Sequence, residues 1–196
     1  MIIVLLGASG SGKSTIEKIL SDKHGYEKIV SYTTRPQRVG ETNGKDYHFI
    51  TNETFKEALH KNLFAEYDEY SQERFYGTLK SDYKKGNKVV VLTPNGFRQL
   101  QKACKDDDIF AVYVDANLGT RVKRYIDRCG VDKFNFDDKN EIAARVERDF
   151  AMFLGLDKEV DMVVVNNEGE DIYNVAKEIH ERCKEIIETE ALSYTE

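Results

Sequence analysis

The chain has 196 residues, of which 40% are hydrophobic and 33% charged, with a formal net charge of −6. This length and balance predict a soluble globular protein with enough chain for a substantial core and for small inserted subdomains. Because the net charge is negative, nucleic acid and anionic membrane surfaces are disfavoured as partners. Any anion must therefore be bound by donors that are clustered locally.

The cysteines and the first residues argue for a cytoplasmic protein. Cys104, Cys129 and Cys183 are widely spaced and fit neither a metal-binding pattern nor a disulfide framework, so we interpret them as reduced thiols. Residues 1–7, MIIVLLG, lack the basic segment of a signal peptide. No apolar run reaches the roughly 18 residues that a membrane helix needs.

The chain begins with alternating strand and helix signals. Residues 1–6, MIIVLL, predict a strand that is buried on both faces of a parallel sheet. Residues 13–25 predict a helix with Ile16, Ile19 and Leu20 on one face and Gly25 at its end. Further apolar runs predict strands at 28–30, 88–93, 109–114 and 161–166. Because strands alternate with helices, we expect a doubly wound α/β fold, with a central parallel sheet flanked by helices.

Two regions interrupt this alternation. Residues 32–86 are polar and rich in tyrosine, and they predict an inserted subdomain of mixed strands and helix, so that 1–31 and 87–196 form the core. Residues 128–141, RCGVDKFNFDDKNE, predict a polar loop between two arginine-bearing helices, within a helical lid at about 124–145. The last segment, 170–192, predicts an amphipathic helix. The side chains expected to face the sheet are Ile172, Val175, Ile179 and Ile186.

Residues 7–14, GASGSGKS, match the phosphate-binding motif G-x-x-x-x-G-K-[ST] between a predicted strand and a predicted helix. Backbone N–H groups of such a loop wrap a diphosphate, and the helix adds its N-terminal dipole. Lys13 can reach the β- and γ-phosphates, and the Ser14 hydroxyl can ligate Mg²⁺. A plain glycine-rich turn is the weaker alternative, because the strand–loop–helix context is complete. The predicted ATP-binding residues of this loop are Gly7, Ala8, Ser9, Gly10, Ser11, Gly12, Lys13, Ser14 and Thr15.

A second anion site is indicated by residues 31–49, SYTTRPQRVGETNGKDYHF. Guanidinium forks beside hydroxyl groups suit the binding of a phosphate. The candidate donors are Ser31, Arg35, Arg38, Tyr47 and Tyr76. The alternative is a solvated basic turn that Glu41 and Asp46 neutralise. Next to a phosphate loop, a pocket for a phosphorylated acceptor is the favoured interpretation, because transfer of a phosphoryl group requires the acceptor to be held.

Four segments together resemble the guanylate kinases, a family of P-loop nucleoside monophosphate kinases. They are GASGSGKST, the 31–49 segment, FAEYDEY (64–70) and RFYGT (74–78), in the family's order and at nearly its spacing. The resemblance spans nearly the whole chain and is strongest over residues 5–79. It implies reversible, Mg²⁺-dependent transfer of the γ-phosphate of ATP to GMP or dGMP, by a monomer or homodimer.

The resemblance also implies roles for individual residues. Glu66 would accept from guanine N1–H and the 2-amino group, and Thr78 would donate to the guanine oxygen. A carboxylate and a hydroxyl are complementary to that face, whereas adenine would place an acceptor against Glu66, and such unpaired groups can discriminate by up to ~10⁴-fold. The residues implied for the GMP phosphate are Ser31, Arg35, Arg38, Tyr47 and Tyr76.

The lid is the third functional region that the resemblance implies. Arg124 and Arg128 are four residues apart on a predicted helix and share one face. Their charge pattern alone favours solvated, salt-bridged helices, whereas the resemblance implies that they stabilise the transferred phosphoryl group. Asn166 would contact adenine. The implied catalytic residues are Lys13, Arg38, Arg124, Arg128 and Arg145.

The sequence departs from the family after the 88–93 run. Val91 and Thr93 stand where guanylate kinases carry two aspartates that help to bind guanine and to organise Mg²⁺. One residue more than expected separates Glu66 from Tyr76, and the predicted lid tip is long and acidic. These departures bear on base selectivity and rate, and they leave phosphate binding intact.

Two alternatives to a guanylate kinase therefore stay open. A related P-loop kinase would act on another nucleotide or a sugar phosphate, and the missing aspartates favour it. A non-catalytic guanylate-kinase-like domain would bind phosphorylated peptides in the acceptor pocket. Such domains lose the phosphate loop, whereas Gly7, Gly12, Lys13 and Ser14 are all present in this chain.

Overall fold

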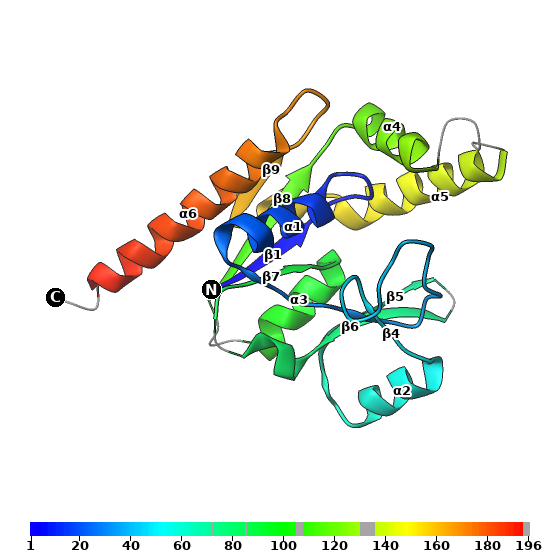
Figure 1. Cartoon of the computed structure of the whole chain (residues 1–196), viewed down its shortest axis with the longest axis horizontal. Helices are drawn as coiled ribbons and strands as arrows, with labels where there is room; N and C mark the ends of the chain where they lie inside the picture. The colour runs from blue at the N-terminus through cyan, green and yellow to red at the C-terminus, as the bar shows by residue number, and fades with distance from the viewer. Residues whose placement is uncertain (72, 85, 105–107, 130–135, 194–196) are drawn as a thin grey trace.

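Two β-sheets organise the protein, whose computed structural model describes residues 1–71, 73–84, 86–104, 108–129 and 136–193 (Figure 1). The larger sheet has the order β2-β7-β1-β8-β9, and its neighbouring strands pair in parallel. Its strands are β1 (Ile2–Leu6), β2 (Glu27–Lys28), β7 (Lys88–Val91), β8 (Ile109–Asp115) and β9 (Met162–Val165). The predicted doubly wound α/β fold is confirmed.

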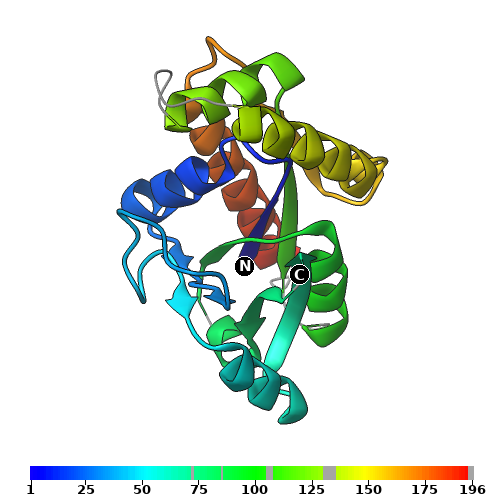
Figure 2. The ribbon, with the colours of Figure 1, turned by 90° about the vertical axis from the view of Figure 1, so that its right-hand side faces the viewer.

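Helices cover both faces of this sheet, because alternate residues of its buried strands point to opposite sides. Ile3 and Leu5 of β1 belong to a core shared with α1 (Lys13–His24) and α6 (Ile172–Ser193), whose ribbons lie side by side in Figures 1 and 2. Ile2 and Val4 belong to a second core, under α3 (Pro94–Ala103). The side chains of α6 that were predicted to face the sheet are confirmed as part of the first core or packed against it: Ile172, Val175, Ile179 and Ile186.

The second sheet has the order β4-β3-β6-β5 and lies below the parallel sheet in Figure 1, beside α2 (Asn52–His60). Its strands are β3 (Tyr32–Thr33), β4 (His48–Phe49), β5 (Phe64–Ser71) and β6 (Arg74–Leu79), and a 3₁₀ turn, η1 (Lys80–Tyr83), follows. Phe55 of α2 stacks on Phe64 and Phe75, with ring centroids 4.3 and 5.3 Å away. All four strands fall within 32–86, and the division into core and insert stays our interpretation.

Two helices, α4 (Leu118–Cys129) and α5 (Phe136–Phe153), contain the described part of the segment predicted as a lid, 124–145, and its role as a lid stays our interpretation. A 3₁₀ turn, η3 (Leu156–Lys158), follows them. The prediction of a loop over 128–141 was wrong for residues 128–129, which belong to α4, and for residues 136–141, which belong to α5. Residues 130–135 lie outside the described part. Neither glycine nor proline occurs in 131–154, so the helical pattern of the later residues extends back to Phe136. No helix in the described ranges is long and apolar enough to cross a membrane.

Candidate active site

The phosphate loop connects β1 to α1 in a conformation that requires glycine at two points. Gly7 has φ 150°, and a Cβ there would lie 2.4 Å from the carbonyl oxygen of Val114. Gly12, the N-cap of α1, has φ 101°, and a Cβ would lie 2.2 Å from Nδ2 of Asn166. Both values favour glycine. The loop therefore packs closely on the end of β8 and on Asn166.

Lys13 folds back over this loop. Its Nζ donates to the carbonyl oxygens of Gly7 at 2.5 Å and Ala8 at 3.0 Å. Burial lowers the pKa of Lys13 to about 8; the carboxylate of Asp149 opposes this shift, and Arg121 adds to it. Lys13 is therefore mainly protonated at neutral pH and is available to a polyphosphate.

The predicted acceptor-phosphate cluster contains one restrained and one exposed arginine. The buried Arg35 donates to both carboxylate oxygens of Glu41, at 2.8 and 2.7 Å, and its guanidinium lies 5.1 Å from the centroid of the Tyr47 ring. Glu41 thus pairs with Arg35, as the alternative of a neutralised basic turn supposed, but Arg35 is buried and not solvated; its contact with a phosphate stays a prediction. Since a guanidinium carries five N–H groups, this pairing fixes the plane of Arg35 and leaves further donors. Arg38 is exposed at the cavity.

Glu66 of β5 places a buried carboxyl group at the cavity. Its side chain is 4% exposed, and its Oε1 accepts from the Thr78 hydroxyl at 2.8 Å. Burial raises the pKa of Glu66 to about 7, although hydrogen bonds from Thr78 oppose the shift. The Thr78 hydroxyl also lies 2.7 Å from the Tyr83 hydroxyl. Because Tyr83 holds Thr78 in place, the hydrogen bond from Thr78 orients the Glu66 carboxyl group. The contact of Thr78 with the guanine oxygen stays a prediction.

One cavity of about 480 Å³ brings most of these residues together. The predicted residues that line it are Gly7, Ser9, Lys13, Ser14, Ser31, Arg35, Arg38, Tyr47, Glu66, Tyr76, Arg128 and Arg145. Those that do not line it are Ala8, Gly10, Ser11, Gly12, Thr15, Thr78, Arg124 and Asn166. The phosphate loop, the arginine cluster and the lid thus face a common space.

Arg124 and Asn166 support the phosphate loop from behind. The Arg124 guanidinium donates to the carbonyl oxygens of Gly10 at 3.1 Å and Ser11 at 3.3 Å, and to Oδ1 of Asn166 at 3.4 Å. Asn166 is fully buried and donates from Nδ2 to Ser11 at 2.7 Å. Its contact with adenine stays a prediction.

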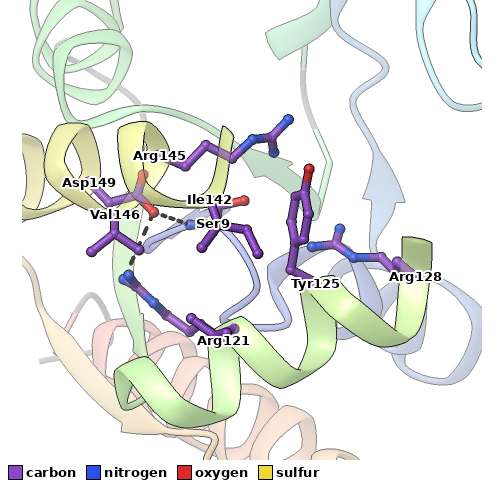
Figure 3. Close-up of a pocket in the computed structure, with 9 residues that line it drawn as sticks. Ser9, Arg121, Tyr125, Arg128, Ile142, Arg145, Val146 and Asp149 are labelled. Atoms are coloured by element: carbon purple, nitrogen blue, oxygen red, sulfur yellow. Dashed lines mark hydrogen bonds and ion pairs between the residues drawn. The ribbon is translucent and has the colours of Figure 1, made fainter. Parts of the chain in front are cut away.

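The other two lid arginines flank an aromatic ring. The guanidinium carbons of Arg128 on α4 and Arg145 on α5 lie 5.9 and 5.3 Å from the centroid of the Tyr125 ring (Figure 3). Cations at this distance interact favourably with an aromatic face. Because both arginines also line the large cavity, Tyr125 holds positive charge at its lid side.

Sequence reasoning missed several residues of the site. Asp149 of α5 is buried and accepts from the Ser9 N–H at 2.9 Å, with Nη1 of Arg121 3.9 Å away (Figure 3). Glu17, one helical turn after Ser14, lines the large cavity and pairs with Lys28 at 3.2 Å. Burial raises the pKa of Glu17. A glutamate beside Ile16 on the buried helix face was the available signal for Glu17, whereas Asp149 gave none.

Comparisons with known proteins identify the family of the chain. A family model described as guanylate kinase matches residues 1–183. The guanylate kinase of Streptococcus mutans is 34% identical over 97% of this chain and 86% of its own length, and that of Onion yellows phytoplasma is 34% identical over 86% and 79%. A crystal structure of guanylate kinase from Anaplasma phagocytophilum has a TM-score of 0.65 at 23% identity, covers 97% and 85% of the two chains, and supports the fold. The chain belongs to the guanylate kinase family.

Proposed function

We propose that this chain transfers the γ-phosphate of ATP to GMP or dGMP, giving ADP and GDP or dGDP. The observation that carries the proposal is the shared cavity. Lys13 of the phosphate loop, Arg38 of the acceptor cluster and the buried carboxyl group of Glu66 all line it. A phosphoryl donor and a phosphorylated acceptor both need such charge compensation, and transfer needs them side by side. The curated guanylate kinases at 34% identity support the same activity.

The roles of the residues follow from where their charges lie. Lys13 and the loop N–H groups hold the phosphates of ATP, and Arg35 and Arg38 hold the phosphate of GMP. Arg128 and Arg145 come from the lid and line the same cavity, so they add positive charge to the space between the two phosphate sites. Charge placed in advance around a transferring phosphoryl group stabilises its transition state.

The residues present fit a magnesium ion as the partner of ATP. Ser14 and Glu17 lie one helical turn apart, and both line the cavity. Hydroxyl and carboxylate oxygens suit Mg²⁺, so Ser14 would hold the ion, with Glu17 as a nearby negative charge. Held there, Mg²⁺ would supply positive charge that offsets the negative charge of the ATP phosphates during transfer.

The setting of the enzyme is also part of the proposal. Cys183 is a buried free thiol, which supports an intracellular, reducing environment, and we infer that the enzyme acts in the cytoplasm. It would act as a monomer or homodimer on ATP and GMP, without nucleic acid or membrane as partners.

A related kinase with another phosphorylated acceptor is the second candidate. Val91 and Thr93 line the cavity at the end of β7, where the family resemblance led us to expect two aspartates. A non-catalytic peptide-binding domain is less well supported, because Lys13 and Ser14 of the phosphate loop line the same cavity.

A coupled assay with ATP and a panel of GMP, dGMP, IMP, AMP and UMP tests the proposal. We expect the highest kcat/KM for GMP or dGMP. Lys13→Ala should lower kcat by orders of magnitude. Arg38→Met should raise the KM for GMP ~10–150-fold and leave the KM for ATP nearly constant, because a charge-assisted hydrogen bond is lost from the acceptor side alone.

The outcomes separate the candidates. If AMP or UMP is phosphorylated better than GMP, the guanine assignment is wrong and the related-kinase candidate replaces it. Turnover that survives Lys13→Ala would mean that the loop does not serve phosphoryl transfer. If every acceptor is inert, the non-catalytic candidate is favoured.

A further inference from the structure

The end of β7 lacks the carboxylates that the family resemblance led us to expect, but a carboxylate from another strand lines the cavity beside it. Asp68 of β5 lines the same cavity as Val91 and Thr93. Its Oδ2 accepts from the Thr93 hydroxyl at 2.6 Å, and its Oδ1 accepts from Nδ2 of Asn95 at 3.3 Å. A carboxylate from another strand therefore stands next to position 93.

Strand register places Asp68 beside Glu66 on one face of the second sheet. Glu66 pairs with Thr78 and Asp68 with Tyr76 across the antiparallel β5–β6 ladder. Since successive side chains of a strand point to opposite faces, residues 66 and 68 share a face. Both line the cavity, and the negative charge of Asp68 adds to the burial that raises the pKa of Glu66. The two carboxyl groups form one acidic wall.

The donors around Asp68 hold its carboxylate in place. Thr93 is the N-cap of α3, where its oxygen also accepts from the Gly96 N–H at 3.0 Å, so the start of a helix fixes its position. Asn95 lies in the first turn of the same helix. An ionised carboxylate has about four acceptor sites. Two are taken by Thr93 and Asn95, and the remaining ones are available to a ligand in the cavity.

We propose that Asp68 is a base-specificity residue that accepts a hydrogen bond from the exocyclic 2-amino group of guanine, beside Glu66. This inference rests on the proposed function. The Watson–Crick face of guanine presents N1–H and the 2-amino group as neighbouring donors. Glu66 and Asp68, two residues apart on one strand face, supply neighbouring acceptors. Asp68 thus takes the place of the carboxylate that position 93 lacks.

The test compares GMP with IMP, which keeps N1–H and lacks the 2-amino group. Asp68→Asn should lower kcat/KM for GMP about tenfold or more, because a hydrogen bond to a charged group is weakened, and should change kcat/KM for IMP little. The KM for ATP should be unchanged. A pH of about 7.5 keeps both Glu66, with its pKa of about 7, and Lys13, with its pKa of about 8, mainly ionised.

Two further variants make the test specific. Thr93→Asp in the Asp68→Asn background returns a carboxylate to the neighbouring position and keeps a good N-cap; it should recover the preference for GMP over IMP. Glu69→Gln is the matched control, because Glu69 is the exposed neighbour of Asp68 and points to the opposite strand face. It should leave both nucleotides unchanged.

Calorimetric binding of GMP and IMP without ATP gives a readout that is independent of turnover. Should Asp68→Asn fold poorly, the exposed Asn95→Ala removes one donor to Asp68 and should weaken GMP about two- to fivefold, with IMP unchanged. An equal loss for GMP and IMP, or an unchanged ratio, overturns the role of Asp68. If wild type prefers AMP or UMP over GMP, the proposed function itself fails.

Discussion

Among the individual residues, Glu66 carries the largest functional consequence, because its carboxyl group titrates near neutral pH. Burial disfavours the charged form and raises the pKa from 4.5 to about 7. The folded state therefore holds the proton more tightly than the unfolded chain. Glu66 therefore adds to the free energy of unfolding at low pH, and this contribution is lost as the pH rises from 4.5 through about 7. The ionised carboxylate is thus unfavourable to the fold, and it lies at the place where guanine donors would bind.

GMP affinity should accordingly depend on pH. Only ionised Glu66 accepts from both guanine donors, so the KM for GMP should rise as the pH falls below about 7, approaching tenfold per pH unit. Glu66→Gln should lower kcat/KM for GMP sharply, because the amide lacks the charge. The measurement is KM for GMP from pH 5.5 to 8 in both proteins.

The ratio between the two proteins isolates Glu66. Phosphate monoesters have a second pKa near 6, and this protonation is common to both measurements. The ratio of wild type to Glu66→Gln should therefore carry the titration of residue 66 alone. A ratio that stays constant through pH 7 would show that Glu66 does not meet the base as a carboxylate.

Among the elements, the strands of the parallel sheet were predictable, and the wall of the base site was not. Continuous apolar runs such as residues 1–6 identify strands buried on both faces, and four of the five predicted runs became strands of this sheet. The run at 28–30 was placed too late, because β2 ends at Lys28. The phosphate loop was predictable because its motif is contiguous. The contact between Asp68 and Thr93 joins residues 25 apart and depends on how α3 packs against β5. No local pattern encodes that packing.

α3 illustrates this dependence at Gly96, which lies over the base site. A Cβ at Gly96 would stand 2.5 Å from Oε2 of Glu66 and 3.4 Å from the Thr93 hydroxyl. Alanine is the better helix former by about 1 kcal/mol. Gly96→Ala should nevertheless raise the KM for GMP about tenfold by displacing Glu66, with the KM for ATP unchanged, as measured by initial rates.

Gly119→Ala in α4 is the matched control for this helix effect. The nearest atom to a Cβ at Gly119 is Oδ1 of Asn117 at 3.5 Å, an ordinary contact. This variant gains helix propensity without a clash, so the KM for GMP should not change. A GMP effect of equal size in both variants would exclude the displacement of Glu66 as the cause.

For the whole molecule, the lid and the phosphate loop are joined across 140 residues of sequence. The Ser9 N–H belongs to the loop that would wrap the phosphates of ATP, and it donates to Asp149 of α5 at 2.9 Å. Arg124 of α4 holds the same loop through the carbonyl oxygens of Gly10 and Ser11. A negative charge of the lid therefore occupies a donor that a phosphate would use, within a cavity rich in arginine and lysine.

Asp149→Asn should tighten the binding of ATP. The substitution removes a buried carboxylate that competes with phosphate oxygens for the Ser9 N–H and that repels them electrostatically. We expect the Kd for a non-hydrolysable ATP analogue to fall by about three- to tenfold, a modest charge effect, and hydrogen exchange at the Ser9 amide to become faster in the nucleotide-free protein. Asp149 also opposes the lowering of the Lys13 pKa, so calorimetry belongs near pH 7, below that pKa of about 8. Weaker ATP binding at that pH would mean that Asp149 acts chiefly by keeping Lys13 charged. The lid would then assist the phosphate loop through Lys13 and would not compete with the nucleotide.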